Sequence, residues 1–106
     1  MKPSEALEVH RVELRDLILR HGAEHPRVYG SALSGADTEE SDLDLLVDAT
    51  ETTTLFMLAR LEHAAQELLG VRVSILTPGF LSEKFRGRVL ERAQPLRSTP
   101  SALKTI

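Results

Sequence analysis

The sequence has no cysteine and no tryptophan, and its aromatic residues are three phenylalanines and one tyrosine. Without cysteine the chain can form neither disulfides nor thiolate metal sites, which is compatible with a reducing compartment. A long apolar run is also missing near the N-terminus, where residues 1–11 mix charged and apolar side chains. No signal peptide or membrane span is therefore expected to begin there, and we expect a cytoplasmic protein without membrane contact.

Positive charge is absent from a long internal stretch, because no lysine or arginine occurs between Val28 and Ala59. The acidic residues of this stretch are Asp37, Glu39, Glu40, Asp42, Asp44, Asp48 and Glu51. Such a region repels a naked polyanion, so we expect no direct contact with nucleic acid. From Lys84 onward basic residues predominate, and that segment could face phosphate or an acidic partner, or could simply be a solvated helix face.

The chain has 106 residues, of which 42% are hydrophobic and 27% are charged, as in an ordinary globular protein. This length corresponds to one domain, which we place at residues 1–97. Residues 98–106 lack apolar periodicity and contain Ser, Thr and Pro, so we expect a loosely held C-terminal tail there. A separate substrate domain does not fit in this length, and the substrate site could therefore require another chain.

Apolar periodicity predicts the order helix, strand, strand, helix, strand, helix. The first helix is expected from Ser4, as its cap, to about His21, and the second from residue 53 to residue 69. The third is expected to begin at Pro78 after the cap Thr77, with a buried stripe formed by Phe85, Val89, Ala93 and Leu96. The strands are expected at residues 27–29, 42–48 and 71–75, with a loop at 34–41. This order predicts an α+β fold, a small mixed sheet with helices packed on one face and the other face free for a ligand.

The most informative segment begins where the first strand ends, at Gly30 and Ser31, and Gly35 follows four residues later. Gly30 has no side chain, so backbone can approach a phosphate closely there. Ser31 offers a hydroxyl and an amide at a turn whose N–H groups can bind an anion. The segment therefore favours a phosphate site.

Two carboxylates follow on the next predicted strand, because Ser41 is succeeded by Asp42, Leu43 and Asp44. Residues two apart on a strand point to the same face, about 6.5 to 7 Å apart along the chain. Carboxylate oxygens suit Mg²⁺, and nucleotidyl transfer needs metal charge at the attacking and leaving oxygens. A Gly-Ser turn or an Asp-bearing strand alone would be ordinary, but their combination at this spacing indicates a nucleotide site.

This pattern resembles the minimal nucleotidyltransferases, whose motif is G-S, three residues, G, five residues and S-D-x-D before an apolar strand. The resemblance covers the chain in order of elements and implies the polymerase-beta nucleotidyltransferase fold. It implies nucleotide binding by Gly30, Ser31 and Ser41, and catalysis and Mg²⁺ binding by Asp42 and Asp44, with ATP as the substrate. Many members are antitoxins paired with HEPN-domain ribonucleases, and active ones transfer AMP from ATP to a tyrosine of the toxin. A HEPN toxin is therefore the implied partner.

Two residues depart from the family pattern. Ser34 stands where the family usually has an arginine before the second glycine, and Ser74 stands where it has a third carboxylate. Asp48 shares the face of Asp44 but lies about 13 Å farther along the strand, too far to substitute. General-base help is worth about a hundred-fold to ten-thousand-fold in rate, so these departures could slow or abolish catalysis.

Three functional readings therefore stay open. The first is AMP transfer to a HEPN toxin, and the second is a catalytically impaired module that neutralises the toxin by binding it. The third, transfer to a small molecule as in aminoglycoside nucleotidyltransferases, is disfavoured because those enzymes use an added helical domain. A zinc site at His21 and His25 is not expected, since Gly22 and Pro26 interrupt their helical spacing.

Overall fold

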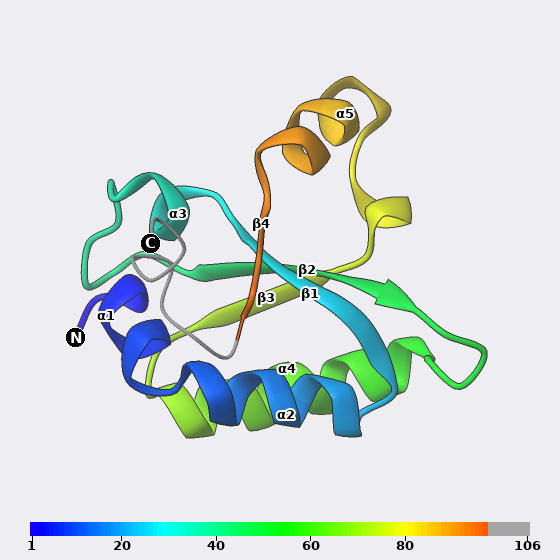
Figure 1. The fold of residues 1–106 in the computed structure, drawn as a ribbon, viewed down its shortest axis with the longest axis horizontal. Coiled ribbons are helices and arrows are strands. Elements are labelled where there is room, and N and C mark those ends of the chain that lie inside the picture. The colour runs from blue at the N-terminus through cyan, green and yellow to red at the C-terminus, as the bar shows by residue number, and fades with distance from the viewer. Residues whose placement is uncertain (98–106) are drawn as a thin grey trace.

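The computed structural model describes residues 1–97, in which a four-stranded sheet lies between two groups of helices (Figure 1). The strands are β1 (Ala23–Tyr29), β2 (Leu43–Ala49), β3 (Val73–Leu76) and β4 (Gln94–Pro95). The helices are α1 (Pro3–Val9), α2 (Arg11–Arg20), α3 (Ser31–Ser34), α4 (Leu55–Leu69) and α5 (Glu83–Arg92), with a 3-10 turn, η1 (Pro78–Phe80). The tail predicted at 98–106 lies outside the described residues. None of the described helices is long and apolar enough to cross a membrane.

The sheet is mixed, with the strand order β3-β2-β1-β4. β2 pairs in parallel with β3, whereas β1 is antiparallel to both β2 and β4. The predicted α+β class with a small mixed sheet is confirmed. β4 was not predicted, because two residues containing a proline give no strand periodicity, yet Gln94 pairs with Val28 at the sheet edge.

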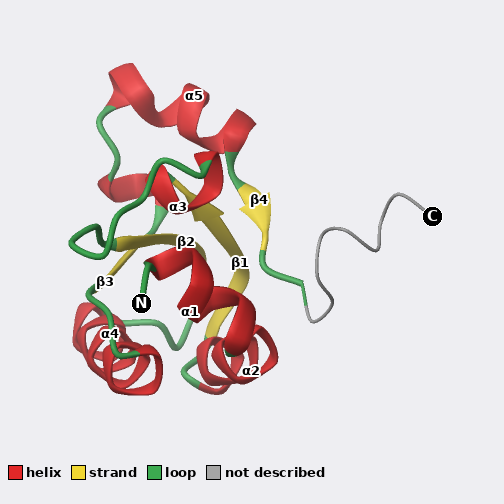
Figure 2. Ribbon diagram, turned by 90° about the vertical axis from the view of Figure 1, so that its left-hand side faces the viewer, coloured by secondary structure: helices red, strands yellow, loops and turns green. Residues whose placement is uncertain are grey.

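The main core lies between the sheet and the layer formed by α1, α2 and α4 (Figure 2). Leu43, Leu45 and Val47 of β2 face this core and are fully buried, as their alternation predicts. α4 begins at its cap Thr54, whose hydroxyl accepts the Met57 N–H at 3.1 Å. Since the alternating apolar residues of β2 are held by the core, the residues between them must face the other way. This parity orients the candidate site.

The N-terminal part differs from the prediction of one helix from Ser4 to His21. His10 leaves helical backbone angles, with φ −114° and ψ 23°, so that α1 and α2 are separate helices. Ser4 does not cap the helix, because its N–H and its hydroxyl donate to Asp37 at 2.8 and 3.1 Å. A short helix that was not predicted, α3, occupies Ser31–Ser34 just before the loop. Local periodicity could not reveal the long-range bonds between Ser4 and Asp37.

The third predicted helix also differs. It is divided into η1 and α5, which lie on the side of the sheet opposite α2 and α4 (Figures 1 and 2). The predicted buried stripe is wrong for α5, of which no residue is buried and Phe85 is 55% exposed. Leu96, the last residue of the predicted stripe, is buried in the core but lies beyond α5. η1 packs against β2, where Leu46 is fully buried on this second face. The second face is therefore partly covered and leaves its carboxylate-bearing end for a site.

Candidate active site

Gly30 lies directly against the carboxylate of Asp44. β1 ends at Tyr29, which is the register partner of Asp44 on β2. Gly30 follows with φ +76°, a left-handed conformation that glycine adopts without steric cost. A Cβ at this position would lie 2.5 Å from Asp44 Oδ2. Both the backbone conformation and the close approach of the carboxylate therefore require glycine at position 30.

Asp42 and Asp44 lie near each other at the N-terminal end of β2. Asp44 is half-buried, and its pKa is raised first by burial and then by the negative charge of Asp42. Such a pair fits a divalent cation, which would neutralise the repulsion between the two carboxylates. Among residues 1–97, no group of three or more His, Cys, Asp or Glu side chains could hold a metal. The cation would therefore have two acidic ligands from this chain.

Ser74 lies beside Asp44 on the neighbouring strand. The parallel pairing of β2 with β3 puts Asp44 opposite Ser74, and Leu43 and Leu45 opposite the buried Val73 and Ile75. Ser74 therefore shares the face of Asp44. A carboxylate at position 74 would join the pair, whereas the hydroxyl present carries no charge.

The two serines of the motif have different surroundings. Ser31 opens α3 immediately after Gly30, and its carbonyl accepts the Ala36 N–H at 3.0 Å. The Ser41 hydroxyl accepts the Thr38 N–H at 2.9 Å and thereby closes the turn before β2. Ser41 thus stabilises the loop that precedes Asp42. Nucleotide binding by Ser31 and Ser41 stays a prediction.

Arg72 was not singled out from the sequence, although it contacts the site directly. Its Nε lies 2.9 Å from Asp42 Oδ1, and its Nη2 donates to the carbonyl oxygen of Glu40. Arg72 immediately precedes β3, and its carbonyl accepts the Leu43 N–H at 2.8 Å. The signal available in the sequence was an arginine two residues before Ser74, but only the parallel pairing of β2 and β3 brings it to Asp42.

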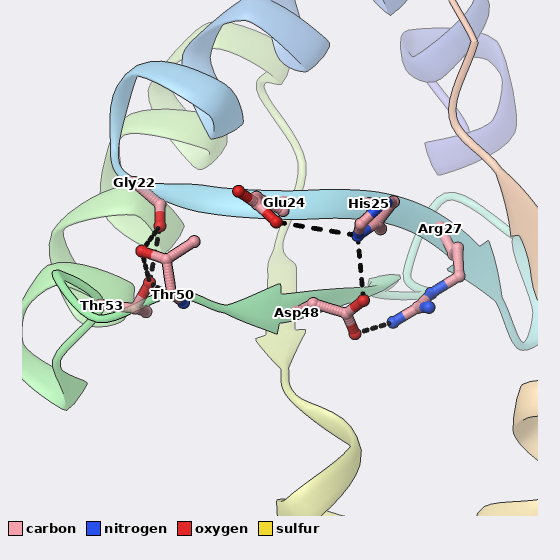
Figure 3. Close-up of polar contacts among 7 residues, drawn as sticks. All are labelled: Gly22, Glu24, His25, Arg27, Asp48, Thr50 and Thr53. Atoms are coloured by element: carbon pink, nitrogen blue, oxygen red, sulfur yellow. Dashed lines mark hydrogen bonds and ion pairs between the residues drawn. The ribbon is translucent and has the colours of Figure 1, made fainter.

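Asp48 contacts an arginine and a histidine at the far end of β2 (Figure 3). Arg27 Nη2 lies 2.7 Å from Asp48 Oδ1, and His25 Nδ1 lies 3.1 Å from Asp48 Oδ2. His25 has φ +49° at a register shift between Glu24 and Arg27, which turns its ring toward β2. The expectation that Asp48 does not substitute for the third carboxylate agrees with these contacts. Arg27 is likewise engaged and is not free to bind phosphate.

Comparison with known proteins agrees with this geometry. The family model for the nucleotidyltransferase domain matches residues 14–96. The protein adenylyltransferase MntA of Thermococcus cleftensis is 36% identical over 84 residues, which are 79% of this chain and 82% of that protein. A solved structure provisionally named a minimal nucleotidyltransferase is 45% identical, covers 88% of this chain and 95% of its own, and has a TM-score of 0.79.

A toxin–antitoxin crystal structure with AMP-PNP shares the fold at 18% identity and a TM-score of 0.71, over 90% of this chain and 78% of that chain. At this identity the likeness concerns the fold. The family model spans most of the chain, and MntA exceeds 30% identity over more than two thirds of it. This chain therefore belongs to the nucleotidyltransferase domain family and has the fold of its minimal members.

Proposed function

We propose that the chain is a nucleotidyltransferase antitoxin that binds ATP with Mg²⁺ and transfers AMP to a HEPN-domain toxin. The observation that carries the proposal is the approach of Gly30 to the Asp42–Asp44 pair, which places a backbone turn suited to phosphate against two carboxylates suited to a cation. The adenylyltransferase name of the Thermococcus relative supports AMP transfer. The toxin–antitoxin structures with the same fold support the kind of partner.

In this proposal the residues have separate tasks. Gly30 lets the backbone approach the phosphates, and Ser31 binds them with its hydroxyl and amide. Asp42 and Asp44 hold the Mg²⁺, which supplies positive charge at the attacking and leaving oxygens. A bond forms between the acceptor oxygen and the α-phosphorus, the bond to the β-phosphate bridging oxygen breaks, and pyrophosphate leaves. The acceptor's proton has no carboxylate to accept it at position 74, so it passes to solvent or to pyrophosphate.

The proposal is tested with the purified chain and a HEPN partner identified from the neighbouring reading frame. Incubation with ATP and Mg²⁺ should add AMP to the partner, measured by mass spectrometry of the intact protein. The double variant Asp42→Ala, Asp44→Ala should abolish the transfer. A double variant as active as the wild type would show that these carboxylates are not the catalytic residues.

A second function is favoured by the position of Ser74 beside Asp44. If the missing carboxylate prevents catalysis, the chain neutralises the toxin by covering it. In that case the wild type inhibits the toxin stoichiometrically without ATP and adds no AMP. Inhibition that requires ATP and leaves modified toxin supports the enzyme instead.

Ser74→Asp separates an impaired enzyme from a binding module. The new carboxylate would stand beside Asp44 and accept the proton of the acceptor hydroxyl. AMP transfer should then rise at least about tenfold, a threshold set below the hundred-fold effect that a well-placed general base typically gives. Ser74→Asn is the matched control, because it has nearly the same shape and no charge. A wild type that already transfers AMP as fast as Ser74→Asp would contradict the view that position 74 limits catalysis.

A further inference from the structure

We propose that Arg72 is a phosphate-binding residue of the nucleotide site, held on Asp42 until a cation and a nucleotide bind. The inference rests on the proposed function and adds a cationic residue to the site. Arg72 Nε lies 2.9 Å from Asp42 Oδ1. Asp42 therefore has a partner that must leave its carboxylate before a cation takes the same oxygen.

Arg72 is a cation that the structure places in contact with the carboxylate pair. No lysine or arginine occurs between Val28 and Ala59, the stretch that contains Gly30, α3 and both carboxylates. Arg27 shares the sheet face but is bound to Asp48 at 2.7 Å. A triphosphate is a polyanion, and charge-assisted hydrogen bonds from a guanidinium are among the strong contacts to phosphate. Arg72 already contacts one of the two carboxylates, so its side chain reaches ligands held by that pair.

The contact of Arg72 with Asp42 is suited to exchange. The side chains of Arg72 and Asp42 are 71% and 49% exposed. Exposed ion pairs contribute little to stability, so breaking this pair costs little. Arg72 also donates to the Glu40 carbonyl, in the loop that leads to Asp42. Release of the guanidinium therefore frees the Asp42 carboxylate and also breaks the hydrogen bond from Arg72 to the Glu40 carbonyl.

This arrangement predicts opposite effects on two ligands. A metal ion alone competes with the guanidinium for Asp42, so Arg72 lowers the affinity for the ion. A metal-bound nucleotide brings phosphates for the displaced guanidinium, so Arg72 raises the affinity for the complex. A residue that merely stabilised the fold would not produce opposite signs. A change in net charge alone would produce them, so a control that changes net charge away from the site is required.

The first measurement is calorimetric titration with Mn²⁺ alone. Arg72→Gln should bind Mn²⁺ severalfold more tightly than the wild type, because the competitor is removed. Arg72→Lys, which keeps the charge but loses the planar fork, should lie between them. The control is Arg60→Gln on α4, which changes net charge equally on the opposite side of the sheet and should match the wild type. Unchanged or weaker Mn²⁺ binding by Arg72→Gln overturns the inference, as does an equal effect of Arg60→Gln.

The second measurement uses AMP-PNP in excess Mg²⁺. Arg72→Gln should bind it about tenfold more weakly, equivalent to 1.4 kcal/mol, while Arg60→Gln should bind as the wild type does. Equal or tighter AMP-PNP binding by Arg72→Gln overturns the inference, provided the wild type binds and the Asp42→Ala, Asp44→Ala variant does not. A wild type whose AMP-PNP binding is independent of both carboxylates refutes the proposed function, and the role of Arg72 falls with it. Thermal unfolding of each variant verifies that the exposed substitutions leave the fold intact.

Discussion

At the scale of single residues, position 30 requires glycine for two reasons, and two different variants can separate them. Its φ of +76° excludes a side chain on grounds of backbone conformation, and Asp44 Oδ2 excludes one on grounds of space. Gly35 has a similar φ of +80°, but nothing lies within 4 Å of the Cβ that would be added there. Gly35→Ala therefore isolates the backbone cost, and Gly30→Ala adds the displacement of a carboxylate.

We expect Gly35→Ala to lower the free energy of unfolding by about 1 to 2 kcal/mol, the usual cost of a left-handed conformation for a residue with a Cβ. Gly30→Ala should cost about 1 to 3 kcal/mol more, because Asp44 must move away from its place. It should also abolish binding of AMP-PNP with Mg²⁺, whereas Gly35→Ala keeps it. Urea denaturation and calorimetry measure both effects. Equal nucleotide affinity of the two variants would contradict the role assigned to the Gly30–Asp44 contact.

At the scale of elements, α5 and α4 have similar apolar spacing but different burial. α4 presents Leu58, Leu61 and Ala65 to the core, while α5 has no buried residue although Phe85 and Val89 recur at helical spacing. Two bonds from Arg86 hold α5 to the preceding turn, with Nε donating to the Pro78 carbonyl at 2.9 Å and Nη2 to the Leu81 carbonyl at 3.0 Å. The position of α5 thus depends on local polar contacts more than on a buried face.

A pair of substitutions measures this difference. Leu61 packs in the core and its side chain is 0% exposed to solvent. Leu61→Ala should therefore lower the free energy of unfolding by about 2 to 5 kcal/mol. Phe85 is 55% exposed, so Phe85→Ser should change it by no more than about 0.5 kcal/mol. Urea denaturation of the two variants tests the contrast. A loss for Phe85→Ser as large as that for Leu61→Ala would place Phe85 in a packed interface.

At the scale of the whole molecule, the bonds between Ser4 and Asp37 connect the N-terminal helix to the loop before the site. The pKa of Asp37 is lowered, chiefly by the backbone N–H of Ser4. A carboxyl group with a lowered folded-state pKa stabilises the fold fully above its unfolded pKa, about 3.9, and loses this contribution as pH falls through the folded value. The pKa of Asp44 is raised, so Asp44 changes the stability with pH in the opposite direction to Asp37. The pH dependence of the wild type alone therefore does not isolate Asp37, and variants must be compared.

Asp37→Asn should be less stable than the wild type at pH 7, by about 1 kcal/mol for weakened hydrogen bonds. The difference should shrink as the pH falls below about 4, since the wild-type carboxylate then takes up a proton. Ser4→Ala keeps the backbone N–H and should retain most of the pH dependence. Urea denaturation from pH 7 to pH 2.5 measures the three curves. Curves for wild type and Asp37→Asn that stay parallel over this range would rule out the contribution of Asp37.

Sequence alone was sufficient for the mixed α+β fold, for β2 and for the family motif. β2 could be predicted because Leu43, Leu45 and Val47 repeat with the period of a strand, and the buried core enforces that period. The glycine at position 30 could also be selected, since a turn that approaches phosphate needs a residue without a side chain. These features are determined by residues close to one another in the sequence, and they can therefore be predicted from the local sequence pattern.

Only the tertiary structure determined which distant groups meet. The edge strand β4 exists because it pairs with β1, far away in the chain, and the exposure of α5 is a result of packing that local periodicity does not record. The contact of Arg72 with Asp42 likewise arises because the parallel pairing of β2 and β3 brings together residues thirty positions apart. Periodicity tells which side of a strand faces a core, but it does not tell which strand lies alongside. The partner of each charge is therefore set by the packing of the sheet.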